Sequence, residues 1–190
     1  MFSEINVSLF YFFNHSLQNP IFDSIMPILS HFGGFKFLLI ILVVIILYAH
    51  IKRKETLRNM AILSLGALLL AGALTAGLKV FIHEPRPSVI LDNVRVLFVE
   101  NDPFAFPSGH SASTWAVVTF LVLNMKELVE KHYKVIDAAL IVFAIAIPFS
   151  RMYVGVHLPF DVLVGCIIGI CCALIVNRYK NEILKIVNRF

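Results

Sequence analysis

The sequence predicts an all-α, membrane-embedded helical bundle, and its composition and hydropathy pattern carry that prediction. Hydrophobic residues make up 59% of the 190-residue chain and charged residues 15%, whereas soluble globular domains average roughly 45–50% and about 25%. A chain this short keeps a large share of its residues at the surface, so this composition requires a surface that faces lipid. Apolar windows with the length of a bilayer span, about 20 residues, recur along the chain.

Five apolar windows are clear, and we expect each to cross the bilayer as a helix. They fall near residues 35–51, 60–80, 108–124, 135–152 and 159–177. The first 31 residues hold two shorter apolar pieces, 5–13 and 21–29, which a polar stretch separates. These pieces form either one broken span, which would bring the total to six, or interfacial helices. We expect one domain over residues 1–190.

Positive charge predicts the sidedness of the bundle, because short cytoplasmic loops carry an excess of Lys and Arg. The excess lies in the 52–59 loop, the 125–134 loop and the C-terminal tail, at Lys52, Arg53, Lys54, Arg58, Lys126, Lys131, Lys134, Arg178, Lys180, Lys185 and Arg189. We therefore expect these segments at the cytoplasmic face of the cell membrane. The 81–107 loop and the 151–158 turn then share the extracytoplasmic face.

Two further expectations follow from the basic residues. The net charge of +4 and the pI near 9.1 do not indicate a nucleic-acid partner, because the Lys and Arg residues sit in short groups beside apolar runs. No Lys or Arg precedes Lys36, and no small-residue cleavage site is visible near the start. We therefore expect no removable signal peptide.

Ionisable and polar residues gather at the predicted extracytoplasmic helix ends. They are Lys79, Arg86, Ser108, Gly109, His110, Arg151, His157 and Asp161. An ionisable side chain at membrane depth costs several kcal/mol unless it is paired or hydrated. Three cations and two histidines on one face therefore require a shared anion, and phosphate is the anion that we expect.

The residues that would hold a phosphate have suitable chemistry. Arg86 lies between two prolines that fix its backbone, and its planar guanidinium can bind phosphate oxygens through two hydrogen bonds. Lys79 adds a point charge from a helix end. Ser108 and Gly109 begin a predicted helix, where free N–H groups and the positive end of the helix dipole face an anion.

The two histidines suit the chemistry of phosphate transfer. His157 and Asp161 are four residues apart at the start of the last apolar window, so the carboxylate can orient the imidazole and raise its nucleophilicity. His110 is then available to protonate the leaving oxygen.

These residues form three ordered motifs. The motifs are Lys79-x6-Arg86-Pro87, Pro107-Ser108-Gly109-His110 and Ser150-Arg151-x5-His157-x3-Asp161. Together they resemble the three-part signature of the type 2 phosphatidic acid phosphatase (PAP2) superfamily.

The resemblance implies hydrolysis of a phosphate ester or anhydride through a phosphohistidine, without a metal or other cofactor. It implies His157 as nucleophile with Asp161, and His110 as acid. The residues that it implies for phosphate binding are Lys79, Arg86, Ser108, Gly109 and Arg151.

The substrate remains open among lipid phosphates. The His83-Glu84-Pro85-Arg86-Pro87 run and the short chain resemble the bacitracin-resistance type of undecaprenyl diphosphatase, which removes the terminal phosphate of a polyprenyl diphosphate at the outer face. A second phosphate needs an extra cation, which Arg95 would supply unless it is a solvated loop residue. Glu84 either orients Arg86 or lies in a solvated loop.

Two other functions fit the same pocket. One is a phosphatase of glycerolipid phosphates, such as phosphatidylglycerophosphate or phosphatidate, because the residues of the signature would bind the phosphate and not the lipid tail. The other is a non-catalytic carrier of lipid or phosphate, although binding alone needs no nucleophile and acid. The expected partners are a lipid phosphate or diphosphate and membrane lipids, and the sequence does not indicate an oligomeric state.

Overall fold

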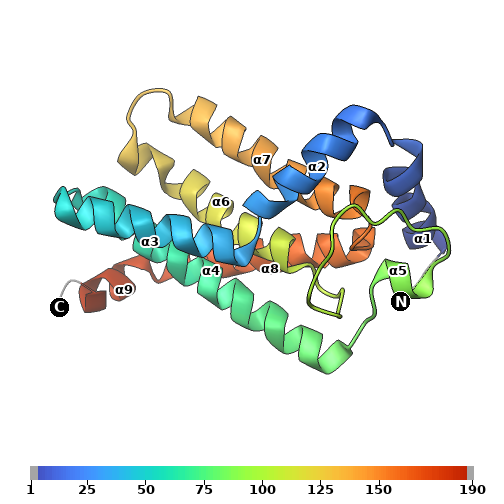
Figure 1. The fold of residues 1–190 in the computed structure, drawn as a ribbon. Helices are drawn as coiled ribbons and strands as arrows, with labels where there is room; N and C mark the ends of the chain where they lie inside the picture. Colours follow the sequence, from blue (N-terminus) through green and yellow to red (C-terminus); the bar gives the residue numbers. More distant parts are fainter. Residues whose placement is uncertain (1–3, 188–190) are drawn as a thin grey trace.

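Ten helical segments make up the part of the chain that a computed structural model describes, residues 4–187 (Figure 1). They are α1 (Glu4–Tyr11), the π-helical segment η1 (Phe12–Ser16), α2 (Pro20–Phe32), α3 (Phe35–Ile51), α4 (Glu55–Ile82), α5 (Pro87–Ile90), α6 (Gly109–Leu128), α7 (Tyr133–Tyr153), α8 (Pro159–Arg178) and α9 (Lys180–Val187). The helical fold class is confirmed for these residues.

Each of the five predicted windows coincides with a helix, namely α3, α4, α6, α7 and α8. By length and composition, α4, α7 and α8 are able to cross a membrane alone. Helices α2 and α3 pass the same test together, as a pair bent by 55°. The described residues thus hold three clear spans and up to four, and the total of five remains a prediction. The second N-terminal apolar piece continues into α3 across this bend.

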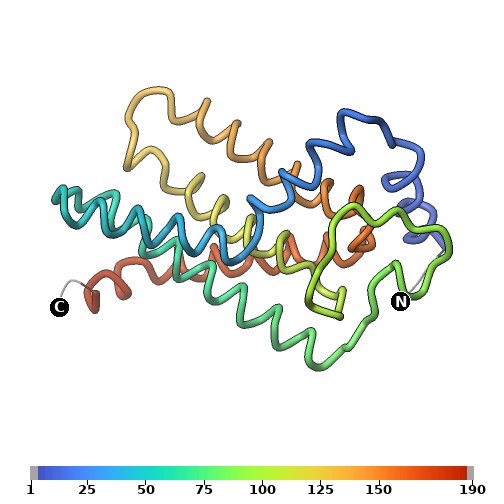
Figure 2. Tube along the Cα trace, in the orientation of Figure 1, coloured from blue at the N-terminus to red at the C-terminus, as the bar shows by residue number. Residues whose placement is uncertain are grey.

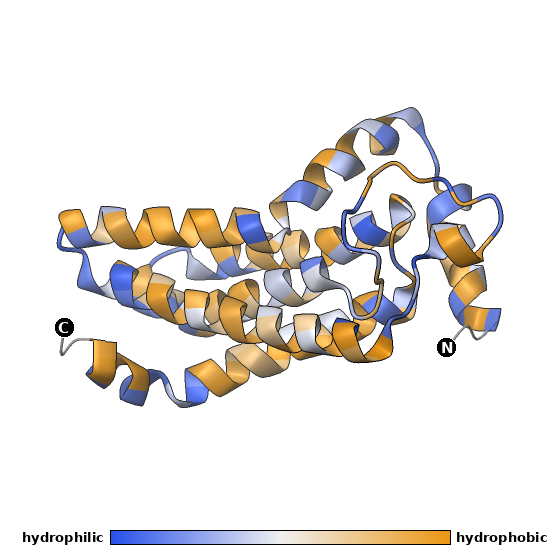
Figure 3. Ribbon diagram, turned by 60° about the horizontal axis from the view of Figure 1, so that its bottom comes forward, coloured by the Kyte–Doolittle hydropathy of each residue, from blue (hydrophilic) through white to orange (hydrophobic). Residues whose placement is uncertain are grey.

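Helix α6 does not pass as a span by itself because it carries many polar residues, and its position explains them. Helices α3, α4, α7 and α8 all pack against it. Ser111, Ser113, Thr114 and Asn124 of α6 are buried in this packing. Apolar residues cover long stretches of the surrounding helices (Figure 3). The bundle therefore keeps its polar side chains at the centre and presents apolar side chains outside.

The two ends of the bundle differ in the segments that they gather. The 52–54 and 129–132 connections lie at the same end as α9, whereas the long 83–108 connection lies at the other end (Figures 1 and 2). This separation agrees with the predicted sidedness of the loops, which remains a prediction. Arg189 of the predicted cytoplasmic tail lies outside the described residues.

Close packing of α8 on α6 brings two of the three motifs together. A Cβ atom added to Gly165 would lie 2.5 Å from the backbone oxygen of Ser108, and one added to Gly169 would overlap the backbone oxygen of Ala112. These glycines let the two helix backbones approach more closely than a larger residue allows. The Ser108 end of α6 is therefore held beside the first turns of α8.

Replacing Gly165 by Ala should destabilise the protein by about 1–3 kcal/mol, because the added methyl group meets backbone and not a flexible side chain. Thermal unfolding of the detergent-purified protein measures the change. Gly77→Ala is the matched control, since a Cβ at Gly77 meets nothing within 4 Å. Equal melting temperatures for the two variants would show that this contact does not set the helix spacing.

Candidate active site

A backbone hydrogen bond links the N-terminus of α6 to the start of α8. The Ser108 N–H donates to the backbone oxygen of Asp161 at 3.0 Å. The Ser108 hydroxyl caps α6 by accepting from the Ser111 N–H at 3.4 Å, and it also accepts from the Ser111 hydroxyl at 3.0 Å. Gly109 is the first residue of the helix. The second motif and the end of the third therefore form one unit.

His157 and Asp161 form a buried pair across the first turn of α8. Pro159 is the first residue of α8, and the Asp161 carboxylate accepts from the Leu158 N–H at 2.9 Å. His157 Nδ1 lies 3.4 Å from Asp161 Oδ2, a contact that lacks the geometry of a full hydrogen bond. Both residues are almost fully buried. The carboxylate is thus close enough to orient the ring.

The opposite nitrogen of His157 faces positive charge. Its Nε2 lies 3.3 Å from Nη1 of Arg86, which also donates to the backbone oxygen of Val156 at 3.0 Å. Burial, together with the charges of Arg151 and Arg86, holds the pKa of His157 well below the ordinary 6.5. The imidazole is therefore neutral at pH 7, and the nitrogen with the lone pair is Nε2, which accepts from Arg86 Nη1.

Three cations, Lys79, Arg86 and Arg151, come together around this pair from α4, the following loop and α7. Their coulombic effects all act on the same His157 ring. Arg151 is completely buried, and its guanidinium pairs with the Ser30 hydroxyl and the Glu100 carboxylate. The predicted cationic residues therefore share one site at the end of the bundle.

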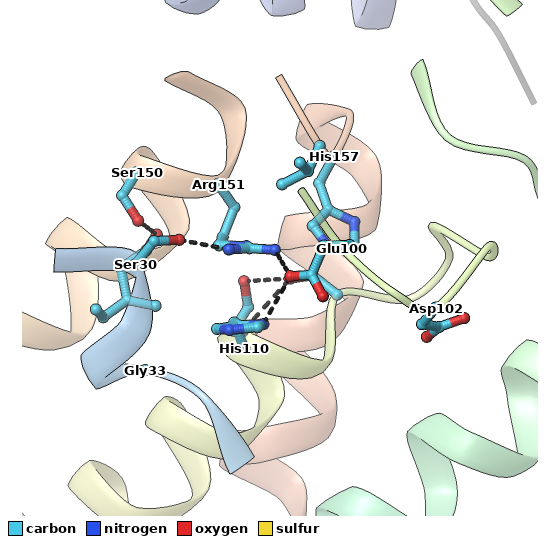
Figure 4. A network of polar contacts seen from close by, with 12 residues as sticks. Ser30, Gly33, Glu100, Asp102, His110, Ser150, Arg151 and His157 are labelled. Carbon is cyan, nitrogen blue, oxygen red and sulfur yellow. Dashed lines mark hydrogen bonds and ion pairs between the residues drawn. The ribbon is translucent and has the colours of Figure 1, made fainter. Parts of the chain in front are cut away.

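His110, in the first turn of α6, lies on the other side of Arg151 (Figure 4). Its Nδ1 is 3.7 Å from Oε1 of Glu100. A Cβ atom added to Gly34 would lie 3.3 Å from His110 Nε2. The bend between α2 and α3 therefore packs closely against the imidazole. Both predicted histidines thus flank the cations.

Three residues that contact the cations carried no signal in the sequence. Glu100 and Asp102 lie in the 91–107 loop, and Ser30 lies in α2. The Lys79 ammonium donates to Asp102 Oδ2 at 2.5 Å and to the Phe104 backbone oxygen at 2.7 Å. The Arg86 Nε–H donates to the Asp102 backbone oxygen at 2.8 Å. Because these contacts join residues far apart in the sequence, no local pattern indicates them.

Arg95 differs from the expectation that it contacts a second phosphate. Nη2 of its guanidinium donates to both oxygens of the Asp23 carboxylate, at 2.8 and 2.9 Å, and Nη1 donates to the Asn14 backbone oxygen at 3.0 Å. The hydrogen bond to Asp23 raises the pKa of Arg95. Arg95 is therefore neither a solvated loop residue nor an unpaired cation, and its second-phosphate role remains a prediction that would require Asp23 to release it.

Asn14 completes this anchor for the 91–107 loop. Its side-chain amide donates to the backbone oxygens of Arg95 and Tyr153 and accepts from the Arg95 N–H, at 2.8 to 2.9 Å. The N-terminal segment therefore holds the loop against the end of α7. Glu84 accepts from the Ala105 N–H through its backbone oxygen at 2.8 Å, and an orienting role for its side chain remains a prediction.

The sequence matches the PAP2 superfamily profile over residues 60–185, which is more than half of the chain. The chain therefore belongs to the PAP2 superfamily. Two curated relatives are phosphatidylglycerophosphatase B and undecaprenyl-diphosphatase BcrC, both from Bacillus subtilis. The first is 28% identical over 172 residues, covering 89% of this chain and 80% of that protein. The second is 27% identical over 168 residues, covering 87% and 79%.

A solved structure agrees with this family. The crystal structure of a PAP2-type phosphatidylglycerolphosphate phosphatase from B. subtilis matches with a TM-score of 0.81 and 26% identity, covering 95% of this chain and 86% of that one. The protein is thus a membrane-embedded phosphoric ester hydrolase that acts on lipid phosphates.

Proposed function

We propose that this phosphatase removes the terminal phosphate of a polyprenyl diphosphate, such as undecaprenyl diphosphate, at the extracytoplasmic face of the cytoplasmic membrane. The observation that carries the chemistry is the buried His157–Asp161 pair with three cations around it. The relationship to an undecaprenyl-diphosphatase supports the substrate. The gathering of basic loops at the opposite end of the bundle supports the orientation.

In the proposed first step, Lys79, Arg86 and Arg151 bind the terminal phosphate, with the Ser108–Gly109 start of α6. Arg86 turns its Nη1–H from His157 Nε2 to the phosphate, Nε2 attacks phosphorus, and the bond from phosphorus to the bridging oxygen breaks. His110, which binds a proton once the negative charge of the phosphate lies beside it, gives that proton to the bridging oxygen, so the lipid monophosphate leaves. Asp161 keeps the His157 ring oriented and offsets the positive charge that the ring gains.

In the proposed second step, His110 removes a proton from water as the water oxygen attacks the phosphohistidine. The phosphorus–nitrogen bond breaks, which restores His157 and releases inorganic phosphate. The side chains present supply the positioning and charge that this transfer needs, since phosphoryl transfer depends mainly on both.

A glycerolipid phosphate is the second candidate substrate. The relationship to phosphatidylglycerophosphatase B and to the solved phosphatidylglycerolphosphate phosphatase favours it. It needs no contact to a second phosphate from Arg95, which pairs with Asp23 in the structure. The chemistry at His157 is the same for both candidates.

Phosphate release from undecaprenyl diphosphate and from phosphatidylglycerophosphate, measured side by side, tests the proposal. The detergent-purified protein is assayed with chelator present and with His157→Ala as control. We expect a higher kcat/KM for the diphosphate and no release from either lipid by the variant. A higher kcat/KM for phosphatidylglycerophosphate would establish the second candidate instead.

A further inference from the structure

Glu100 is a carboxylate at the position where the proposed mechanism needs a phosphate. Figure 4 shows its carboxylate between Arg151 and His110, with His157 adjacent. Oε1 pairs with the Arg151 guanidinium and lies 3.7 Å from His110 Nδ1. Arg151 is fully buried, and the Glu100 side chain is only 17% exposed. The protein itself thus supplies an anion to its anion site.

A second carboxylate of the same loop acts on another cation. Asp102 pairs with Lys79 at 2.5 Å. Two of the three cations at the site are therefore neutralised by residues two positions apart. A phosphate that approaches Arg151 meets a like charge at Glu100. Because both anions compete for one guanidinium, the presence of Glu100 lowers the affinity of the site for phosphate.

Backbone hydrogen bonds hold the 91–107 loop on both sides of Glu100. The Leu97 N–H donates to the Val154 oxygen at 3.1 Å, and the Ala105 N–H donates to the Glu84 oxygen at 2.8 Å. Between these bonds, Val99 is 84% exposed. Asp102 is held by Lys79 and Arg86, so the short segment between Leu97 and Asp102 is the part of the loop that would move to withdraw Glu100.

We infer that Glu100 is an internal competitor for the phosphate site, which it vacates when a lipid phosphate binds and retakes when inorganic phosphate leaves. The inference rests on the proposed function, because it assigns the Arg151 site to phosphate. Substrate keeps the additional contacts of its lipid tail with the membrane-embedded protein, whereas free phosphate has none. Displacing Glu100 lowers the affinity for both ligands by the same factor, but the tail contacts keep the substrate bound, whereas inorganic phosphate has no other contact that offsets the loss, which limits inhibition by the product.

The dissociation constant of inorganic phosphate tests this role. Isothermal titration of phosphate into the detergent-purified full chain should give a Kd at least about tenfold lower for Glu100→Gln than for the unchanged protein, the factor expected when a hydrogen bond between charged groups no longer competes. Glu100→Ala removes the carboxylate without leaving an amide and should shift the Kd in the same direction. Inhibition of lipid hydrolysis by phosphate should strengthen in parallel.

Glu130→Gln is the matched control, because it removes the same charge from an exposed position at the other end of the bundle, and its Kd should equal that of the unchanged protein. A Kd that is unchanged or higher in both Glu100 variants would overturn the inference, since Glu100 would then orient His110 or help to bind the ligand.

The titration is repeated in a His157→Ala background, which separates this inference from the proposed function. Phosphate binding there does not depend on turnover. Turnover that survives in His157→Ala contradicts the proposed mechanism, whereas a Kd that does not fall on removal of the Glu100 carboxylate contradicts only the competitor role.

Discussion

His157→Ala should lower kcat by at least about 10⁴-fold, because removal of a covalent nucleophile leaves only the binding and charge effects of the site. The imidazole is buried, neutral at pH 7 and surrounded by Arg86, Arg151 and Asp161. Little change in KM is expected, since the cations that hold the phosphate remain.

Release of inorganic phosphate under saturating substrate measures this loss. His50→Ala serves as the control, because His50 is exposed at the opposite end of the bundle and should keep full activity. Trapping the enzyme with radiolabelled substrate in acid-free denaturant should label the unchanged protein and leave the His157 variant unlabelled. A variant with more than about one per cent of the original kcat would rule out the phosphohistidine.

Arg151→Lys should lower kcat/KM by about 10² to 10³-fold, although the charge is kept. The guanidinium is fully buried, contacts both the Ser30 hydroxyl and Glu100, and lies 4.9 Å from the centre of the Phe98 ring. A planar fork in this position is able to bind two phosphate oxygens, whereas an ammonium binds as a point charge. Loss of one donor aimed at transition-state charge typically has this magnitude.

The steady-state parameters of Arg151→Lys show where the contact acts. A fall in kcat indicates that the guanidinium binds the transition state more strongly than the substrate, whereas a rise in KM alone indicates uniform binding. Arg178→Lys, at an exposed position near the end of α8, should match the unchanged protein. Activity within threefold of the original for Arg151→Lys would remove Arg151 from the phosphate site.

The hydropathy pattern predicted the helices well because lipid imposes a length and a composition on every span. The window 159–177 became α8 at Pro159–Arg178, and 35–51 became α3 at Phe35–Ile51. The start of the chain was less predictable. Its two short apolar pieces form α1 and α2, and the course of these helices depends on tertiary contacts such as that of Asn14 with Tyr153, which no local pattern indicates.

The motifs identified residues that the structure brings together, because ionisable groups in an apolar chain are expensive unless they share partners. The structure gathers Lys79, Arg86 and Arg151 beside His157 as expected. Glu100 could not be predicted in the same way, since an acidic residue in a polar loop resembles any solvated side chain. The partner of Arg95 was missed for a related reason, because Asp23 lies 72 positions away in the sequence.

The polar centre of α6 has a consequence for how the protein enters the membrane. Helices α4, α7 and α8 are apolar enough to cross a bilayer by themselves, whereas the buried serines, threonine and asparagine of α6 are tolerated only with protein on all sides. During synthesis α6 emerges after α4 but before α7 and α8. Its stable insertion must therefore await the downstream helices, so a ribosome-bound chain that ends at α6 should remain extractable from the membrane.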